Sequence, residues 1–182
     1  MKLDCNQKFE ISEENRSHKI NIYIEIDGVI LRNPNNLSWR ASWDVAPHAV
    51  EFLEWALSNH NPEWLTGRDM EGTGEGVTEA LMKANGCSAR LLRVASLIPS
   101  IFFYLQKTGF IDFSTPFIWI DRNPNPRDLR NLERKNCLDR CLVIDTNEHP
   151  NDLLYASAHI KANINTLRCR PISIDGNSTG IQ

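Results

Sequence analysis

Cysteine is scarce in this sequence, and its few cysteines follow no ligand pattern. The 182 residues contain five of them and no Cys-x-x-Cys pair, and Cys137-x-x-x-Cys141 has no second Cys or His pair at zinc-ligand spacing nearby. This pattern argues against a disulfide framework and against a structural zinc site. We expect reduced thiols and a cytoplasmic protein.

Long apolar runs and a strong net charge are also absent from the sequence. No stretch approaches the roughly 18 consecutive apolar residues of a membrane-spanning helix. Residues 1–17 lack the apolar core of a signal peptide. The formal net charge is −3 and the sequence pI is about 6.0, so no global basic field would hold nucleic acid. We expect no membrane association.

The length of 182 residues suits one domain with a sizeable hydrophobic core. We predict an N-terminal appendage over residues 1–18 and a folded domain over residues 19–161. Residues 162–182 are predicted to form a C-terminal tail that is partly docked or disordered.

Residues 20–31 carry the most informative pattern in the chain. The run Ile20–Ile26 is almost continuously apolar, as in a strand that is buried on both faces of a parallel sheet. Glu25 and Asp27 lie two positions apart near its end and so point to the same side, and Gly28 follows at once. Because ligands bind at the carboxyl ends of strands in open α/β sheets, the pattern predicts a site here.

This stretch resembles the first motif of the haloacid dehalogenase-like (HAD) phosphohydrolases, in which four apolar residues precede Asp-x-Asp-Gly. In that family the first Asp is the nucleophile and the second is the general acid/base. Asp27-Gly28-Val29 matches the second half of the motif, and Glu25 stands at the position of the nucleophilic Asp. The resemblance implies an α/β fold of HAD type, a three-layer Rossmannoid sandwich around a mainly parallel sheet of about five strands, without a large cap.

Three further segments resemble the remaining HAD motifs and occur in the same order. Thr66-Gly67 follows a short predicted strand, where the family has a hydroxyl that binds the transferred phosphoryl group. Lys107 precedes the fourth predicted strand, where the family has a basic residue that neutralises phosphate. Asp121 ends that strand, where the family has a magnesium ligand.

The resemblance therefore implies a complete phosphotransfer site that holds Mg²⁺ and a phosphoryl group. Catalysis would involve Glu25, Asp27, Thr66 and Lys107. The implied phosphate contacts are Thr66, Gly67 and Lys107, and the implied Mg²⁺ ligands are Glu25, Asp27 and Asp121.

Two positions depart from the family pattern, and both belong to the metal and nucleophile unit. Glu25 adds one methylene, and a displacement of the attacking oxygen by about 1 Å costs on the order of 100-fold in rate. Arg122 places a positive charge beside Asp121, where the family usually has an acidic residue. At about 4 Å and an effective dielectric of about 20, a unit charge costs a cation about 4 kcal/mol. Together the departures predict a site that has lost or changed its original use.

The rest of the chain fits alternating strands and helices. A short flap is expected over residues 32–44. Predicted strands cover 20–26, 63–65, 91–94, 117–121 and 141–145, and predicted helices cover 47–59, 77–85, 99–107, 128–136 and 150–161.

Two local patterns allow a functional and a structural interpretation. The glycine-rich stretch Gly72–Gly76 is either a phosphate loop or a flexible lead into the next helix, and its acidic neighbours favour the second. Arg127, Arg130 and Arg134 lie near one face of a predicted helix. They form either a phosphate-facing stripe or a solvated helix face, and the solvated face is the commoner case.

Three functional hypotheses follow from the sequence. The first is a degenerate HAD-like domain that binds a phosphorylated ligand or a protein partner. The second is an active Mg²⁺-dependent phosphatase in which Glu25 takes the phosphoryl group as a glutamyl phosphate from an open, macromolecular phosphorylated substrate, and water then hydrolyses it. A nucleic-acid end is a candidate substrate that the net charge does not support. The third is a receiver-like domain, which fits Asp27-Gly28 and the short flap less well. The sequence gives no oligomeric state.

Overall fold

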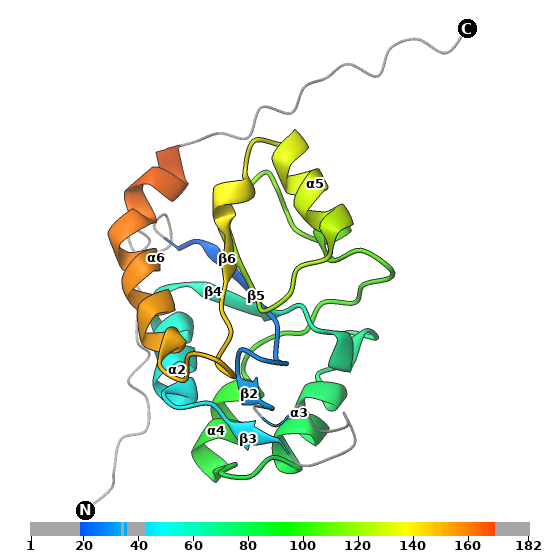
Figure 1. Cartoon of the computed structure of the whole chain (residues 1–182), viewed down its shortest axis with the longest axis vertical. Helices are drawn as coiled ribbons and strands as arrows, with labels where there is room; N and C mark the ends of the chain where they lie inside the picture. The colour runs from blue at the N-terminus through cyan, green and yellow to red at the C-terminus, as the bar shows by residue number, and fades with distance from the viewer. Residues whose placement is uncertain (1–18, 34, 36–42, 170–182) are drawn as a thin grey trace, which may run out of the picture.

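A computed structural model describes residues 19–33, 35 and 43–169 of the chain. In this part, parallel strands form a four-stranded central sheet in the order β4-β1-β5-β6 (Figure 1). The strands are β1 (Asn21–Ile24), β4 (Asn61–Trp64), β5 (Phe117–Asp121) and β6 (Cys141–Val143). Helices cover both faces of this sheet, so the chain has an α/β architecture compatible with a Rossmann-like sandwich.

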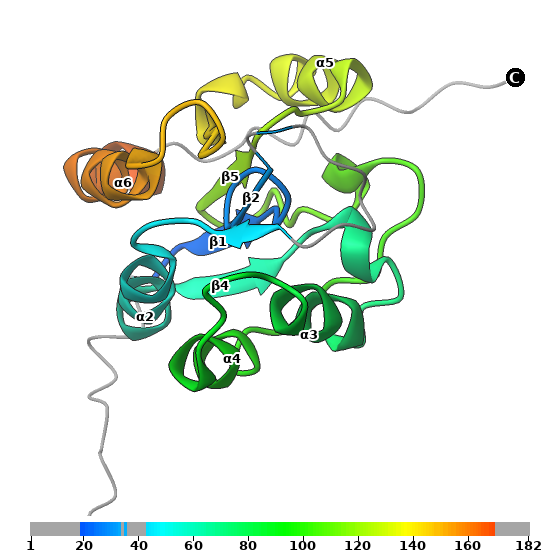
Figure 2. The same cartoon turned by 60° about the horizontal axis from the view of Figure 1, so that its bottom comes forward.

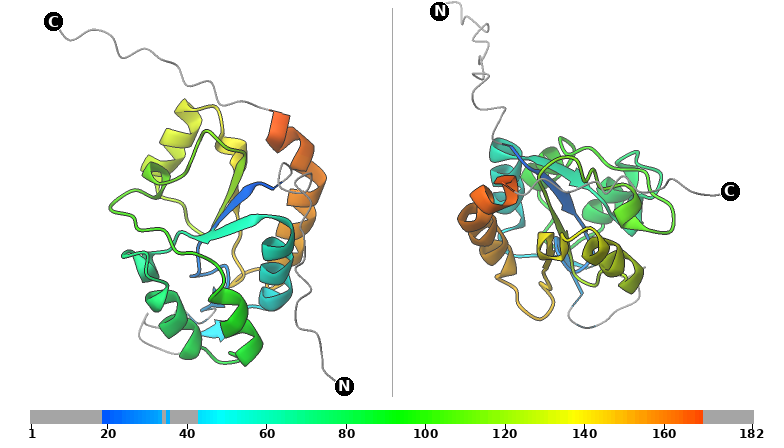
Figure 3. Two further views of the ribbon diagram at one scale, coloured as in Figure 1. Left: turned by 180° about the vertical axis from the view of Figure 1, so that it is seen from behind. Right: turned by 90° about the horizontal axis from the view of Figure 1, so that it is seen from above.

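The two faces of the sheet carry different side chains because alternate residues of a strand point to opposite sides. Isoleucines from β1 and β5 face a large apolar core, which they share with α2 (Ala49–Asn59), α3 (Glu75–Met82), α4 (Ala89–Ala95) and α6 (Asp152–Cys169). Tyr23, Phe117 and Trp119 face the other way and pack near Leu132 of α5 (Pro126–Arg134). Figure 2 shows β1 and β4 between α5 on one side and α2 and α4 on the other. Figure 3 shows α2 and α6 together, away from α5.

The strand order creates a switch point at the carboxyl edge of the sheet. The chain moves from β1 to its neighbour β4 and then crosses to β5 on the opposite side of β1. Ile24 pairs with both Trp64 and Ile120, so the ends of these three strands lie at one level. Loops that leave such a point in different directions open a space where ligands bind in α/β proteins.

The predicted flap lies largely outside the described residues. Its two ends pair as a small antiparallel ribbon, β2 (Leu31–Arg32) with β3 (Asp44–Val45). The expected appendage over residues 1–18 and the end of the expected tail, residues 170–182, also lie outside the described part.

The predicted strand over 91–94 is wrong, and the central sheet therefore has four strands in the described part of the chain, where about five were expected. These residues belong to the helix α4, in which Leu91, Val94 and Ala95 recur at helical spacing and are buried. Ser88 caps the helix, because its hydroxyl oxygen accepts a hydrogen bond from the Leu91 N–H at 3.1 Å. A short apolar run has no periodicity that separates a strand from a buried helix.

The predicted helix over 99–107 is also wrong. The Trp64 N–H donates to the Pro99 carbonyl, and the Ile101 N–H donates to the Trp64 carbonyl, so this segment runs alongside the end of β4. Lys107 begins a separate 3-10 turn, Lys107–Gly109. Tertiary pairing with β4 thus replaces a helix that the local sequence allowed.

Other predicted boundaries shift by a few residues. β5 covers the predicted residues, whereas β1, β4 and β6 are placed differently at one or both ends, and α2 begins two residues after Pro47. The last helix continues to Cys169, beyond its predicted end at 161, and Leu167 within it is buried. In the described ranges, no helix has both the length and the hydropathy needed to cross a membrane.

Candidate functional site

Four of the residues singled out in the sequence lie together at the switch point. Glu25 follows β1, Thr66 follows β4 and Asp121 ends β5. Lys107 is the first residue of the 3-10 turn Lys107–Gly109. Glu25, Thr66 and Asp121 are buried, with exposed fractions of 8, 0 and 4 %. Together with Asp27 they form what we call the strand-end site.

The carboxylate of Glu25 is held by several donors of its own chain. Its Oε1 atom accepts hydrogen bonds from the backbone N–H groups of Ile26 at 2.8 Å and Asp27 at 3.2 Å. The same atom accepts from the Thr66 hydroxyl at 2.5 Å. The second oxygen, Oε2, pairs with the Lys107 ammonium. The extra methylene of glutamate allows the carboxylate to fold back onto the N–H groups of its own turn.

Lys107 neutralises two buried carboxylates at once. Its ammonium pairs with Glu25 and also donates to Asp121 Oδ2 at 2.6 Å. Burial alone would lower the pKa of Lys107, but the two carboxylates together raise the pKa above its usual value. Burial and the nearby Glu25 raise the pKa of Asp121, although Lys107 opposes them. The ammonium therefore remains charged at neutral pH and binds the two strand ends together.

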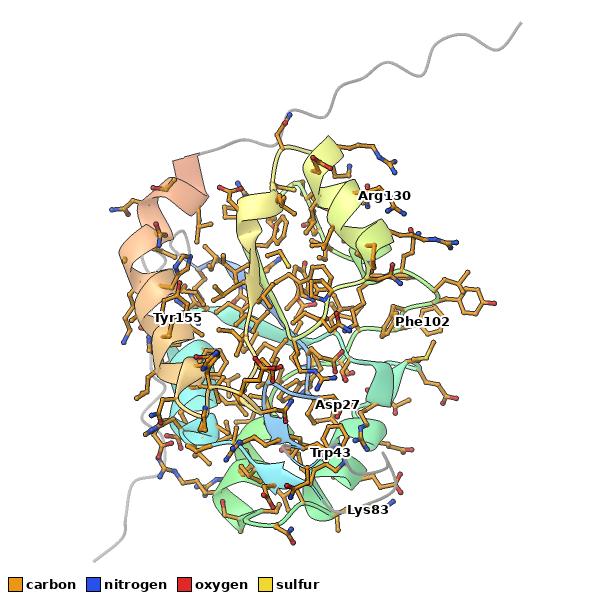
Figure 4. The ribbon with its side chains drawn as sticks, in the orientation of Figure 1. Asp27, Trp43, Lys83, Phe102, Arg130 and Tyr155 are labelled. Atoms are coloured by element: carbon orange, nitrogen blue, oxygen red, sulfur yellow. The ribbon has the colours of Figure 1, made fainter. Side chains whose placement is uncertain are left out.

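Asp27 faces a different cation. Arg68 donates from Nε to both of its carboxylate oxygens, at 2.9 and 3.0 Å. The guanidinium carbon of Arg68 lies 4.8 Å from the centroid of the Trp43 ring. Figure 4 labels Asp27 and Trp43. Burial raises the pKa of Asp27, Arg68 opposes this, and Glu25 adds to it. The sequence reasoning gave Arg68 no role. Its position directly after Thr66-Gly67 was the available signal, because that turn was already expected at the site.

Arg122, the second departure from the family pattern, crosses over Gly28. Gly28 has a φ of +77°, a backbone conformation that favours glycine. A Cβ atom there would lie 2.1 Å from Arg122 Cδ and would displace this side chain. Burial raises the pKa of Asp27, and the charge of Arg122, like that of Arg68, opposes this rise. Its side chain therefore lies along the first motif.

The turn that carries Lys107 is fixed to α5. The Thr108 N–H and hydroxyl donate to Asp128 Oδ1 at 3.0 and 2.6 Å, and Asn131 donates to the Thr108 hydroxyl at 3.0 Å. Thr108 and Asp128 are buried. The position of Lys107 therefore depends on two side chains of a helix that follows it in the chain.

The glycine-rich stretch is a lead into a helix rather than a phosphate loop. Asp69 accepts from the Gly74 N–H at 2.7 Å and from the Gly76 N–H at 3.4 Å, and α3 begins at Glu75. These N–H groups are therefore engaged within the chain. Gly67, expected to contact phosphate, is exposed and begins a 3-10 turn, Gly67–Asp69. The next N–H, that of Arg68, donates to Thr66 Oγ1 at 3.3 Å.

The side chains as arranged do not fit the expected magnesium ion. Mg²⁺ requires near-octahedral oxygen ligands, and Asp27 is turned to Arg68 while Lys107 lies between Glu25 and Asp121. Within residues 19–33, 35 and 43–169, no group of three or more His, Cys, Asp or Glu side chains is arranged to hold a metal.

Comparisons of the chain with family models, curated proteins and solved structures give no significant match. The interpretation of the strand-end site therefore rests on its own residues and their geometry.

Proposed function

We propose that this chain is a HAD-like phosphohydrolase-fold domain whose site is degenerate, with weak or lost catalysis and a binding or regulatory role. The meeting of Glu25, Thr66, Lys107 and Asp121 at one edge of a parallel sheet supports the HAD-like assignment. One observation carries the degenerate assignment: the carboxylate of Glu25 occupies the donors that a transferred phosphoryl group would need.

The donors around Glu25 form an anion-binding cradle. Two backbone N–H groups, from Ile26 and Asp27, converge on one oxygen together with the Thr66 hydroxyl, and the Lys107 ammonium meets the other oxygen. Preorganised donors of this kind stabilise the charge of a transferred phosphoryl group. Here the glutamate itself fills the cradle, and its lone pairs are engaged. An attack on phosphorus would first have to break these interactions.

The first test is the binding of inorganic phosphate to the wild type and to Glu25→Ala, measured by isothermal titration calorimetry. The substitution empties the cradle while leaving its donors in place. We expect Glu25→Ala to bind phosphate at least about tenfold more tightly than the wild type, because one charge-assisted hydrogen bond contributes about 1.5–3 kcal/mol. Glu71→Ala removes an exposed acid from a nearby loop and serves as the matched control. Equal phosphate affinity in the wild type and Glu25→Ala would contradict a cradle filled by glutamate.

The second test is turnover of p-nitrophenyl phosphate with and without Mg²⁺. We expect background rates for the wild type and a gain on the order of 100-fold for Glu25→Asp, alone or with Arg122→Asp, because a retracted carboxylate recovers the attacking position. Wild-type turnover that is lost in Asp27→Asn would overturn the degenerate assignment.

That outcome would favour the second candidate, an active phosphatase that attacks through Glu25 with the help of Mg²⁺. One observation favours this candidate: burial raises the pKa of Asp27, and a raised pKa is the direction that a general acid requires. Mg²⁺ would then have to displace Lys107 from the two carboxylates, so strong activation by Mg²⁺ in the turnover assay would distinguish this candidate from the first.

A further inference from the structure

Three arginines form a continuous positive face on α5. Arg127, Arg130 and Arg134 follow one another at spacings of three and four residues and therefore lie on the same side of the helix. All three are exposed. None of the ion pairs among the described residues involves them. We call these residues the arginine face.

The arginine face borders a polar hollow of about 420 Å³, which Gln106 and Asn131 complete. Asn131 is held in place by its hydrogen bond to Thr108. The hollow thus presents three guanidinium groups and two amides. Planar guanidinium groups with several N–H donors match phosphate oxygens better than other side chains do.

Exposed aromatic side chains lie on the segment that leads into this hollow. Phe102 and Tyr104 have exposed fractions of 57 and 66 %, and they come shortly before Gln106 in the chain. Phe102 also meets the Phe110 ring edge-on, with centroids 6.0 Å apart. Figure 4 shows Phe102 and Arg130 on the same side of the molecule. Large apolar side chains that gather at an exposed surface are characteristic of a binding site, and Tyr104 lies two residues from Gln106 of the hollow.

The backbone of this segment is strained as well. Leu105, between Tyr104 and Gln106, has a φ of +66°, a conformation that a bulky side chain rarely adopts. Its side chain is 74 % exposed, so burial of that side chain does not compensate for the strain. Strained backbone of this kind gathers at ligand-binding sites.

We infer that the arginine face and the exposed rings of Phe102 and Tyr104 together bind single-stranded nucleic acid. The phosphodiester groups lie along Arg127, Arg130 and Arg134, and unpaired bases stack on Phe102 and Tyr104. A cationic groove beside exposed rings is the chemistry that single strands require. A duplex would keep its bases stacked inside and leave the rings unused. The overall charge of −3 does not oppose this binding, because salt screens charges beyond about 8–10 Å. The inference does not depend on whether the strand-end site is catalytic.

The test is fluorescence anisotropy of the full chain with a fluorescein-labelled oligothymidylate of about 12 nucleotides. Three phosphate contacts on a single strand predict a slope of log affinity against log salt of about −2. We expect the triple variant Arg127→Gln/Arg130→Gln/Arg134→Gln to bind at least about tenfold more weakly at low salt and to lose most of this slope. If the triple variant fails to fold, Arg130→Gln alone tests the same contact and reduces the slope by about 0.7.

Two controls separate strand binding from general attraction between charges. Arg93→Gln removes an exposed arginine from α4 and is expected to leave the affinity unchanged. Tyr104→Ala is expected to weaken oligothymidylate binding roughly fivefold or more, through lost stacking, and to leave the binding of inorganic polyphosphate unchanged. No binding by the wild type, or equal losses in Arg93→Gln and Arg130→Gln, would overturn the inference. Equal affinity of the wild type for oligothymidylate and for a duplex of the same length would also overturn it. So would equal affinity for oligothymidylate and polyphosphate, if Tyr104→Ala leaves oligothymidylate binding unchanged.

Discussion

The strand-end site and the arginine face differ in whether their charged side chains have ion-pair partners within the chain. At the strand-end site each carboxylate has a cation within the chain: Glu25 and Asp121 share Lys107, and Asp27 has Arg68. On the arginine face three cations lie close together, and no carboxylate among the described residues forms an ion pair with them. The charges of the first region are therefore paired within the chain, whereas those of the arginine face are not, as far as the described part of the chain extends.

A single helix connects the two regions. α5 displays the arginine face on its exposed side, and its Asp128 and Asn131 hold Thr108, the neighbour of Lys107. The comparison therefore predicts different costs for the loss of a charge. Removal from the paired region should reduce stability, and removal from the unpaired region should reduce binding.

The largest effect on stability is expected for Lys107→Gln. This substitution leaves the buried carboxylates of Glu25 and Asp121 without their shared cation, and loss of one partner from a buried ion pair costs about 3–5 kcal/mol. Urea unfolding measures the change in the free energy of unfolding. Arg130→Gln is the matched control and should stay within about 0.5 kcal/mol of the wild type. Similar values for the two variants would remove the distinction between the regions.

A smaller loss is expected for Asp128→Ala, which cuts the link between them. The Thr108 N–H and hydroxyl both lose a buried acceptor, and an unsatisfied buried donor costs about 1–3 kcal/mol. Amide hydrogen exchange at Thr108 should become faster in the same variant. Glu133→Ala, an exposed acid on the same helix, is the control. Unchanged exchange at Thr108 would show that α5 does not hold the turn.

Asp27→Asn should change how stability depends on pH. Burial raises the pKa of Asp27 above 3.8, so the folded chain holds this proton more tightly than the unfolded chain does. The resulting stabilisation is complete below about pH 3.8 and is lost as pH rises through the folded-state pKa. Asn does not titrate, so the stability of Asp27→Asn does not fall in this way as pH rises. Its melting temperature relative to the wild type should therefore rise from acidic to neutral pH and then level off.

Asp69→Asn provides a contrast of opposite sign. Burial alone would raise the pKa of Asp69, but hydrogen bonds from its neighbours lower it below 3.8. The donors are the Thr73 hydroxyl and the N–H groups of Gly74 and Gly76. Its stabilisation is present above pH 3.8 and is lost as pH falls through the folded-state pKa. The variant should be less stable than the wild type at neutral pH and should approach it in acid. Curves of the same sign for both variants would contradict these assignments.

Sequence reasoning located the strand ends of the site better than the elements between them. The strand 117–121 and its terminal Asp121 were predicted from an apolar run that ends in an acid, because that pattern depends only on local burial. The segments 91–94 and 99–107 were assigned wrongly. In the first, a short apolar run fits both a helix and a strand, and in the second, pairing with Trp64 of β4 decides the conformation.

The hydrogen-bond and ion-pair partners within the strand-end site could not be predicted from the sequence, for a different reason. The resemblance to the HAD motifs predicts Glu25 and Lys107 at the same edge, but it does not specify that Glu25 folds back onto the N–H groups of Ile26 and Asp27. The pairing of Asp27 with Arg68 likewise depends on rotamers that the whole site selects together. Glu25 and Arg122 already predicted a degenerate site from the sequence, and these contacts add how the Glu25 carboxylate is held.

The smallest effect, and the one that most sharpens the comparison, concerns the stability of the arginine triple variant. Like charges three or four residues apart on a helix destabilise it by about 0.2–0.5 kcal/mol per pair, and the arginine face contains two such pairs. Arg127→Gln/Arg130→Gln/Arg134→Gln should therefore be slightly more stable than the wild type at low salt, and salt should abolish the gain. Arg90→Gln, which breaks the exposed pair with Glu54, should give no gain. Urea unfolding at low and high salt measures both variants. A gain in stability together with lost oligonucleotide binding would mean that these arginines lower the stability of α5 and serve binding instead. A loss of stability would instead make them structural.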